Sequence, residues 1–175
     1  ASDVYKRQGT YRCEITDFSV NGDMLADGTV DGAVCCLDSL NHITDYSAFC
    51  TAISKVSLFL EKDRLFIFDL NTVFKHKHIL ADNTYVIDRE DVYCVWQNET
   101  DPETLETDIS LDFFIRDGDV YRRSGEEFSE RAYSDRQIDE ALISAGLEKV
   151  AVYEDMTLSP PKDTTERAIY VTRKI

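Results

Sequence analysis

Two short apolar runs, separated by one helical pattern, limit the folds open to this chain more than any other feature of its sequence. The runs VDGAVCCL (Val30–Leu37) and RLFIFDLNT (Arg64–Thr72) are typical of strands buried on both faces of a parallel sheet. From Asp45 to Leu60 apolar residues recur at helical spacing, and Thr44 or Asp45 can cap that helix. This strand, helix, strand unit has a right-handed crossover, which brings both strand ends to one edge of the sheet.

Polar residues follow both predicted strands. Asp38, Ser39, Asn41 and His42 come after the first run, and Asp69 and Asn71 end the second. Ligands of open α/β sheets bind at this carboxyl edge, so these side chains are candidates for a pocket. The same residue types also organise turns and cap helices, and the sequence leaves both interpretations open.

The middle of the chain, from Thr84 to about Ala132, changes to a period-two alternation of apolar and polar residues. This pattern predicts three or four antiparallel strands. The segment Glu99–Pro102 predicts one turn, because the residue before a proline avoids helix. The pair Asp117 and Gly118 predicts a tight type I′ hairpin.

The last quarter of the chain returns to the α/β pattern. Ser134 and Gln137 form a capping box at the start of a predicted helix, and Gly146 provides a left-handed cap at its C-terminal end. Two final strands are predicted from Leu147 and from Arg167.

The first residues do not resemble a natural start. The chain opens without Met, and SDVYKRQ (Ser2–Gln8) resembles translated sequencing-adapter sequence. We therefore expect residues 1–8 to be a non-native junction, and residues 9–175 to form a single domain. The segment Thr10–Ile15 resembles a strand end, and Asn21–Gly32 is typical of a loop.

Composition narrows the class of partner. The chain has 34 acidic and 19 basic residues and a formal net charge of -15, so its field repels phosphate backbones and anionic membranes. We therefore expect neither a nucleic acid nor a membrane partner. No apolar run approaches the roughly 18 residues of a membrane span, and no signal peptide opens the chain, which favours a cytoplasmic protein.

Cysteine and histidine patterns do not predict a metal centre. The five cysteines lack CxxC spacing, and we expect each to be buried as a small hydrophobic residue. The segment HKH (His76–His78) has no third ligand nearby, so we expect a loop there and no metal.

Several segments together resemble a known family. VDGAVCCLDSLNHI, FLEKDRLFIFDLNT, YRRSGEEFSERAYSDRQIDEALISAGL and ERAIYVTRK are similar to segments of bacterial small-molecule enzymes in the class I S-adenosylmethionine-dependent methyltransferase superfamily. The resemblance covers roughly Cys13 to Lys174. It implies an α/β fold with a truncated Rossmann-like sheet: strands 4 to 7, a remnant of strand 3, and an antiparallel β lid after strand 5, over about residues 84–132.

The resemblance also implies a cofactor and its site. S-adenosylmethionine (SAM) would lie at the carboxyl edge, and the glycine-rich loop that binds it would precede this chain. The implied cofactor-binding residues are Glu14, Leu37, Asp38 and Ser39. The implied substrate-binding residues are Asn41, Asp69 and Asn71, with Trp96, Phe113, Tyr121, Arg123, Glu126 and Arg131 on the lid. Phe128 stands where the relatives usually carry His, which weakens the case for a base supplied by the lid.

Asp38 and His42 are the candidate catalytic residues. Either could accept a proton from an amine or hydroxyl, and the unperturbed pKa of histidine suits work near neutral pH. Capping or a solvated loop remains the alternative for His42, and an ion pair with Glu126 for Arg131. The resulting hypothesis is methyl transfer to N or O of a small molecule by a fragment inactive alone, which could form a homodimer through the lid. The alternative is a noncatalytic ligand-binding or interaction domain.

Overall fold

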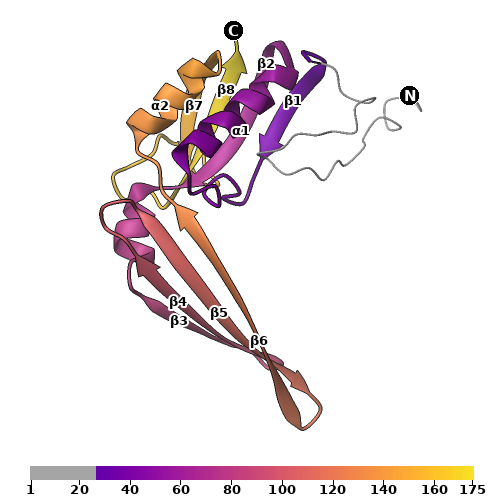
Figure 1. Cartoon of the computed structure of the whole chain (residues 1–175), viewed down its shortest axis with the longest axis vertical. Helices are drawn as coiled ribbons and strands as arrows, with labels where there is room; N and C mark the ends of the chain where they lie inside the picture. The colour runs from indigo at the N-terminus through magenta and orange to yellow at the C-terminus, as the bar shows by residue number, and fades with distance from the viewer. Residues whose placement is uncertain (1–26) are drawn as a thin grey trace, which may run out of the picture.

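A computed structural model describes residues 27–175 of the chain, which form two sheets (Figure 1). The predicted junction at residues 1–8, the strand end at Thr10–Ile15 and the cofactor candidate Glu14 lie outside the described residues. The two sheets differ in composition and in what covers them, and they meet near one edge of the first.

The first sheet has the strand order β1-β2-β8-β7. Its strands are β1 (Val30–Cys35), β2 (Leu60–Asn71), β7 (Leu147–Glu154) and β8 (Arg167–Lys174). β1 and β2 are parallel, whereas β8 lies between β2 and β7 and is antiparallel to both. This confirms the expected α/β sheet with its last strand inserted in the opposite direction.

Two helices, α1 (Tyr46–Phe59) and α2 (Asp135–Ser144), cover one face of this sheet (Figure 1). Both begin where the sequence predicts. The side chain of Asp45 accepts a hydrogen bond from the Ala48 amide, and Ser134 and Gln137 form the complete capping box. Helix and sheet residues then pack into one core, which includes Phe49, Ile53, Phe66, Phe68, Ile138 and Leu142.

The predicted burial of the first strand on both faces is wrong for the described part of the chain. Val34 is 68% exposed. β1 has a described sheet neighbour on one side only, and its residues Ala33 and Cys35 pack against the core whereas Val34 does not. The expectation of buried cysteines also fails at Cys36, which is exposed just after β1.

The second sheet is an antiparallel meander that extends away from the first (Figure 1). Its strands are β3 (Thr84–Asp88), β4 (Val92–Thr100), β5 (Glu106–Asp117) and β6 (Val120–Arg131). The predicted type I′ turn between β5 and β6 is wrong. Gly118 and Asp119 form the two-residue loop, and only Gly118, at φ 65°, has a positive φ, whereas type I′ needs two.

The predicted loop at His76–His78 is instead part of a π-helical turn, η2 (Lys75–Leu80). This turn follows β2 and packs against β4 and β5, so it lies where the two sheets meet. The burial of His76 and Leu80 was not visible in a local pattern, because η2 packs against strands that are distant in the sequence. No helix in the described range, residues 27–175, is long and apolar enough to span a membrane.

Candidate functional site

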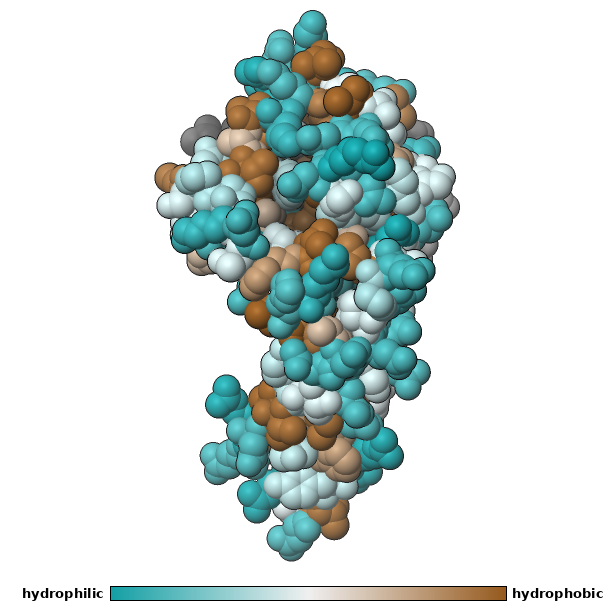
Figure 2. All heavy atoms as spheres, turned by 90° about the vertical axis from the view of Figure 1, so that its left-hand side faces the viewer, coloured by the Kyte–Doolittle hydropathy of each residue, from teal (hydrophilic) through white to brown (hydrophobic). Residues whose placement is uncertain are grey.

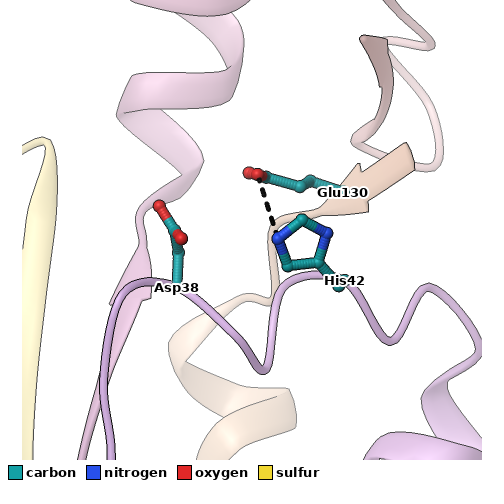
Figure 3. A group of neighbouring side chains, drawn as sticks. All are labelled: Asp38, His42 and Glu130. Carbon is teal, nitrogen blue, oxygen red and sulfur yellow. Dashed lines mark ion pairs between the residues drawn. The ribbon is translucent and has the colours of Figure 1, made fainter. Parts of the chain in front are cut away.

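The carboxyl ends of β1 and β2 carry a cluster of polar side chains that the end of β6 completes. Asp38 and His42 come from the loop after β1, and Glu130 comes from β6 (Figure 3). His42 Nε2 lies 3.7 Å from Glu130 Oε1. One potential ligand atom of each of the three residues lies within 4.8 Å of the other two. We call Asp38, His42 and Glu130 the edge cluster.

The backbone at the end of β1 turns sharply to present this loop. Leu37 and Asp38 have φ values of 60° and 50°, a left-handed conformation that residues other than glycine rarely adopt. The Asp38 amide donates to Asp69 Oδ2 at 3.1 Å, which supports the turn. The turn leaves the Leu37 side chain 74% exposed. The Ser39 hydroxyl donates to the Cys36 carbonyl within the same turn.

Arg167 joins the two predicted aspartates. Its guanidinium lies 2.6 Å from Asp38 Oδ2 and 3.1 Å from Asp69 Oδ2. Two carboxylates therefore share one cation, and the buried Asp69 Oδ1 has no hydrogen-bond partner. Sequence reasoning missed Arg167, although it begins the final strand, and the start of an antiparallel strand must lie beside the end of β2.

Asn71 connects both halves of the site. Its Nδ2 donates to Asp38 Oδ2 at 2.9 Å and to Glu130 Oε2 at 3.0 Å. Its Oδ1 accepts from Lys75 Nζ at 2.9 Å. Asn71 is 2% exposed, so its amide sets the positions of two carboxylates from the interior.

Glu130 is the second residue that sequence reasoning missed. It is 6% exposed, and burial raises the pKa of its carboxyl above the ordinary value. The sequence around Glu130 contains a pattern that could have identified it as a site residue. Glu130 alternates with Phe128 on one face of β6, and the Phe128 ring lies 5.2 Å from the His42 ring. A carboxylate on an apolar face is unusual and marks a candidate site.

His76 lies beside Glu130 from the interior side. The imidazole is fully buried, and burial lowers its pKa to about 4, so the ring is neutral near pH 7. Its Nδ1 is 2.8 Å from the Thr107 hydroxyl. Its Nε2 has no hydrogen-bond partner and lies 4.0 Å from Glu130 Oε2.

Asn41 has a structural place in this fold. It is fully buried, and its Nδ2 donates to the Asn71 and Arg131 carbonyls while its Oδ1 accepts from the Asn71 amide. All these partners are backbone groups, so this side chain connects the loop after β1 with the ends of β2 and β6. Contact with a substrate would require breaking these bonds.

Arg131 does not pair with Glu126. The two residues lie five apart on β6 and therefore on opposite faces of the strand. Arg131 instead donates to the Thr44 carbonyl at 2.8 Å and lies over the Tyr133 ring. It too connects the second sheet with the loop before α1.

Most predicted lid residues lie away from the edge cluster. Tyr121 is at the distal end of β6, and at about 3.3 Å per residue it is roughly 33 Å along the strand from Arg131. Arg123 forms an exposed ion pair with Asp112, and Phe113 pairs with Ser124 in the same distal region. Other predicted lid residues are nearer. Cross-strand pairing puts Trp96 and Glu126 on the face that carries Phe128 and Glu130.

The sequence and the fold are similar to those of curated and solved proteins. YqeM of Bacillus subtilis (strain 168), named as a methyltransferase, is 26% identical over 148 residues, 85% of this chain and 60% of that protein. A crystal structure of an S-adenosylmethionine-dependent methyltransferase from Clostridium acetobutylicum ATCC 824 matches 93% of this chain and 63% of its own, with 28% identity and a TM-score of 0.83. In sequence and in fold, the chain is similar to S-adenosylmethionine-dependent methyltransferases.

A third similarity concerns the fold alone. CalS10 of Micromonospora echinaspora, an amino pentose methyltransferase solved with SAM bound, matches 93% of this chain at 14% identity with a TM-score of 0.68. No family model matches the chain. The chain spans about 60% of the length of YqeM, and a similar share of the Clostridium methyltransferase.

SAM is the methyl donor of the S-adenosylmethionine-dependent methyltransferases that this chain resembles. SAM carries a cationic sulfonium, and the shared guanidinium of Arg167 leaves the pair Asp38 and Asp69 with a net negative charge. The unpaired, buried Asp69 Oδ1 strengthens that negative potential. The exposed Leu37 side chain offers an apolar contact beside it.

Proposed function

We propose that this protein transfers a methyl group from SAM to a nitrogen or oxygen of a small molecule, at the carboxyl edge of β1 and β2. The edge cluster carries this proposal, because it sets a half-exposed imidazole beside a buried carboxylate on a methyltransferase sheet. Displacement at a sulfonium needs an aligned acceptor, a suitable charge environment and a place for the acceptor's proton. The edge cluster meets the last two needs.

Leu37, Asp38 and Ser39 would hold the donor. SAM supplies an activated methyl group, and these residues contribute the apolar contact, the negative charge and the hydroxyl at the turn after β1. Asp69 would not touch the donor, because it is 7% exposed and paired with Arg167. It would contribute negative charge near the sulfonium.

His42 would serve as the general base. Its side chain is 44% exposed, so an acceptor can reach it, and Glu130 lies 3.7 Å from its Nε2. The imidazole would take the proton that an amine or hydroxyl loses on methylation. The Glu130 carboxylate would then stabilise the imidazolium, as an acidic partner does in other acid–base pairs.

A small-molecule acceptor fits the surface next to the cluster. Trp96, Phe128 and Glu126 form a mixed aromatic and acidic strip on the face of the second sheet that leads to Glu130. The net charge of -15 disfavours polyanionic acceptors. The fold relative CalS10 is named for an amino pentose, an acceptor of the size and polarity that this strip would suit.

The test separates donor binding from chemistry. In a protein extended at its N-terminus by the glycine-rich segment that the family resemblance implies, we expect SAM to bind in calorimetry. We also expect label from methyl-labelled SAM to enter a metabolite in a mixture of small amines and alcohols. His42→Ala should lower the rate of transfer about 10²- to 10⁴-fold, the usual contribution of a general base, with little change in SAM affinity. The matched control is His78→Ala, which removes an exposed imidazole on η2 whose ring centroid lies 4.9 Å from that of Phe74.

Absence of SAM binding by the folded, extended protein would overturn the assignment and favour a noncatalytic domain. Full transfer by His42→Ala would overturn only the role of His42.

We also propose that two copies associate through the distal end of the second sheet. Large apolar side chains are exposed there, and apolar surface interrupts the hydrophilic surface of the narrow end in Figure 2. They are Val86, Ile87, Tyr93, Ile115, Val120 and Tyr121, with exposed fractions from 37% to 58%. The cross-strand register puts Ile87, Ile115 and Val120 on one face of the sheet and Val86, Tyr93 and Tyr121 on the other. Exposed apolar surface marks interaction sites. Light scattering of the purified protein should give a dimer mass, and a monomer over the micromolar range would contradict this.

A further inference from the structure

A cavity separate from the edge cluster lies on the helix-covered side of the first sheet. It opens between the first turn of α2, strands β7 and β8, and the loop that joins these two strands (Figure 1). Its volume is about 690 Å³. Pockets that hold drug-sized molecules have volumes of roughly 300 to 1,000 Å³. None of the three edge-cluster residues lines this cavity, so a ligand bound here would occupy a second site.

The walls of the cavity belong to the core of the first sheet. Leu70, Ile138 and Tyr170 line it, and each is at most 5% exposed. The Tyr170 ring stacks on the Phe68 ring, with centroids 5.1 Å apart and planes 6° apart. The core therefore fixes these walls before any ligand enters. An apolar wall of this kind suits the aromatic or aliphatic body of a ligand.

The charged residues around the cavity leave negative charge without a basic partner. Asp135, Asp139 and Asp163 line the cavity together with Lys149 and Lys162. Lys149 pairs with Asp139, and the ammonium of Lys162 lies 3.0 Å from a carboxylate of β7 that is not part of the lining. Among the described residues, no basic side chain forms an ion pair with Asp135 or Asp163. The cavity therefore favours a cation over an anion.

This negative charge acts on the interior wall as well as on the rim. Burial raises the pKa of the Tyr170 phenol, and the charges of Asp135 and Asp139 raise it further. Two carboxylates from the first turns of α2 therefore act on a ring in the cavity wall. A cationic group that enters the cavity would experience the same field.

We propose that this cavity binds an organic cation, namely a primary amine with an aromatic or bulky aliphatic body. The body would pack against Leu70, Ile138 and Tyr170. The ammonium would donate charge-assisted hydrogen bonds to Asp135 and Asp163, which have no basic partner among the described residues. This site goes beyond the proposed methyl transfer, because it requires neither SAM nor the edge cluster.

The experiment is a fluorescence titration of the protein in the absence of SAM. The probe is monodansylcadaverine, which joins a dansyl ring to a primary amine, and the matched probe is its N-acetyl derivative, which lacks the charge. We expect one equivalent of the amine to bind with blue-shifted emission, because the dansyl ring enters an apolar cavity. The N-acetyl derivative should bind about 10-fold more weakly, since it cannot form charge-assisted hydrogen bonds.

Variants of the two unpaired aspartates test the charge. Asp135→Asn and Asp163→Asn should each lower the affinity for the amine about 3- to 10-fold and leave that for the N-acetyl derivative unchanged, because both side chains are exposed and partly screened by solvent. Asp119→Asn, at the hairpin between β5 and β6, is the matched control and should bind both probes as the parent does.

A further variant tests the location. Val152→Phe places a larger side chain at the cavity wall and should lower the affinity for both probes at least about 10-fold. Circular dichroism verifies that each variant is folded. Asp135 and Asp163 are exposed, so their variants keep the test decisive if Val152→Phe does not fold.

The proposal is overturned if the emission of the amine does not change, or if the amine and its N-acetyl derivative bind equally well. It is also overturned if both aspartate variants, or a folded Val152→Phe, bind the amine with parental affinity. Methyl transfer is measured separately, so any of these results would leave the proposed function intact.

Discussion

The two sheets of this protein are stabilised in different ways. The first sheet packs against α1 and α2, and aromatic residues of this core, Phe49 of α1 and Phe66 and Phe68 of β2, are at most 1% exposed. The second sheet has long ladders, with strands of 12 residues in β5 and β6, but among the described residues its fully covered apolar side chains are few, chiefly Cys94 and Ile109. The first sheet is therefore a scaffold held by a core, and the second is held mainly by backbone pairing.

The edge cluster lies where these regions meet. Asp38 and His42 belong to the scaffold, and Glu130 belongs to the second sheet. Movement of the second sheet would therefore change the distance between the imidazole and its carboxylate. This arrangement suits a lid that closes over an acceptor and completes the site as it does so.

The largest expected effect comes from the scaffold core. Phe68→Ala should lower the free energy of unfolding by about 3 to 5 kcal/mol, because it leaves a cavity beneath α1 and α2. Val120→Ala, at a side chain 58% exposed at the tip of the second sheet, should change it by less than about 0.5 kcal/mol. Denaturant unfolding followed by circular dichroism compares them, and equal losses would contradict the contrast between the sheets.

The next effect distinguishes the contact between the two sheets from the interior of the second sheet. Asn41→Ala leaves the Asn71 amide and two carbonyls without partners, and each buried orphan costs about 1 to 3 kcal/mol. Hydrogen exchange should speed up at the ends of β2 and β6 together. Asn98→Ala, whose side chain bonds to Trp96 and Asn83, is the control and should affect the second sheet only. If exchange in Asn41→Ala speeds up in one sheet only, Asn41 does not couple the two sheets.

Two cysteines measure local opening in the two sheets. Burial raises the pKa of the Cys35 thiol in β1 to about 11, and it also raises the pKa of Cys94 in β4. Both thiols should therefore alkylate slowly at pH 8 in the folded protein. In denaturant below the unfolding midpoint, Cys94 should label several-fold faster than Cys35, although it is only 4% exposed, because the second sheet opens locally. Mass spectrometry of the labelled peptides measures both rates, and faster labelling at Cys35 would reverse the comparison.

The smallest effect on folding is expected at the distal surface. Tyr121→Lys should leave the free energy of unfolding of the monomer within about 0.5 kcal/mol of the parent, because the side chain is 55% exposed. It should weaken self-association strongly, since a charge would be placed in an apolar contact. Light scattering over a concentration series measures this, with Arg136→Lys on the exposed face of α2 as the control. A dimer of unchanged strength would place the contact elsewhere.

Local signals in the sequence predicted most of the elements. The side chains that cap α1 and α2 lie within three residues of the amides they bind, so their patterns are readable without any tertiary contact. The errors have a common cause. The exposure of Val34, the burial of His76 and the form of the hairpin at Gly118 each depend on what packs or pairs with the segment.

The sequence by itself determined an acidic α/β chain with a polar edge after its first two strands, because strand period, helix period and caps are properties of neighbouring residues. Only the tertiary structure decided which side chains meet at that edge. It brought Arg167 to Asp38 across 129 residues, and Glu130 to both histidines. The register between strands and the antiparallel insertion of β8 set those contacts, and such long-range pairing leaves no mark in a local pattern.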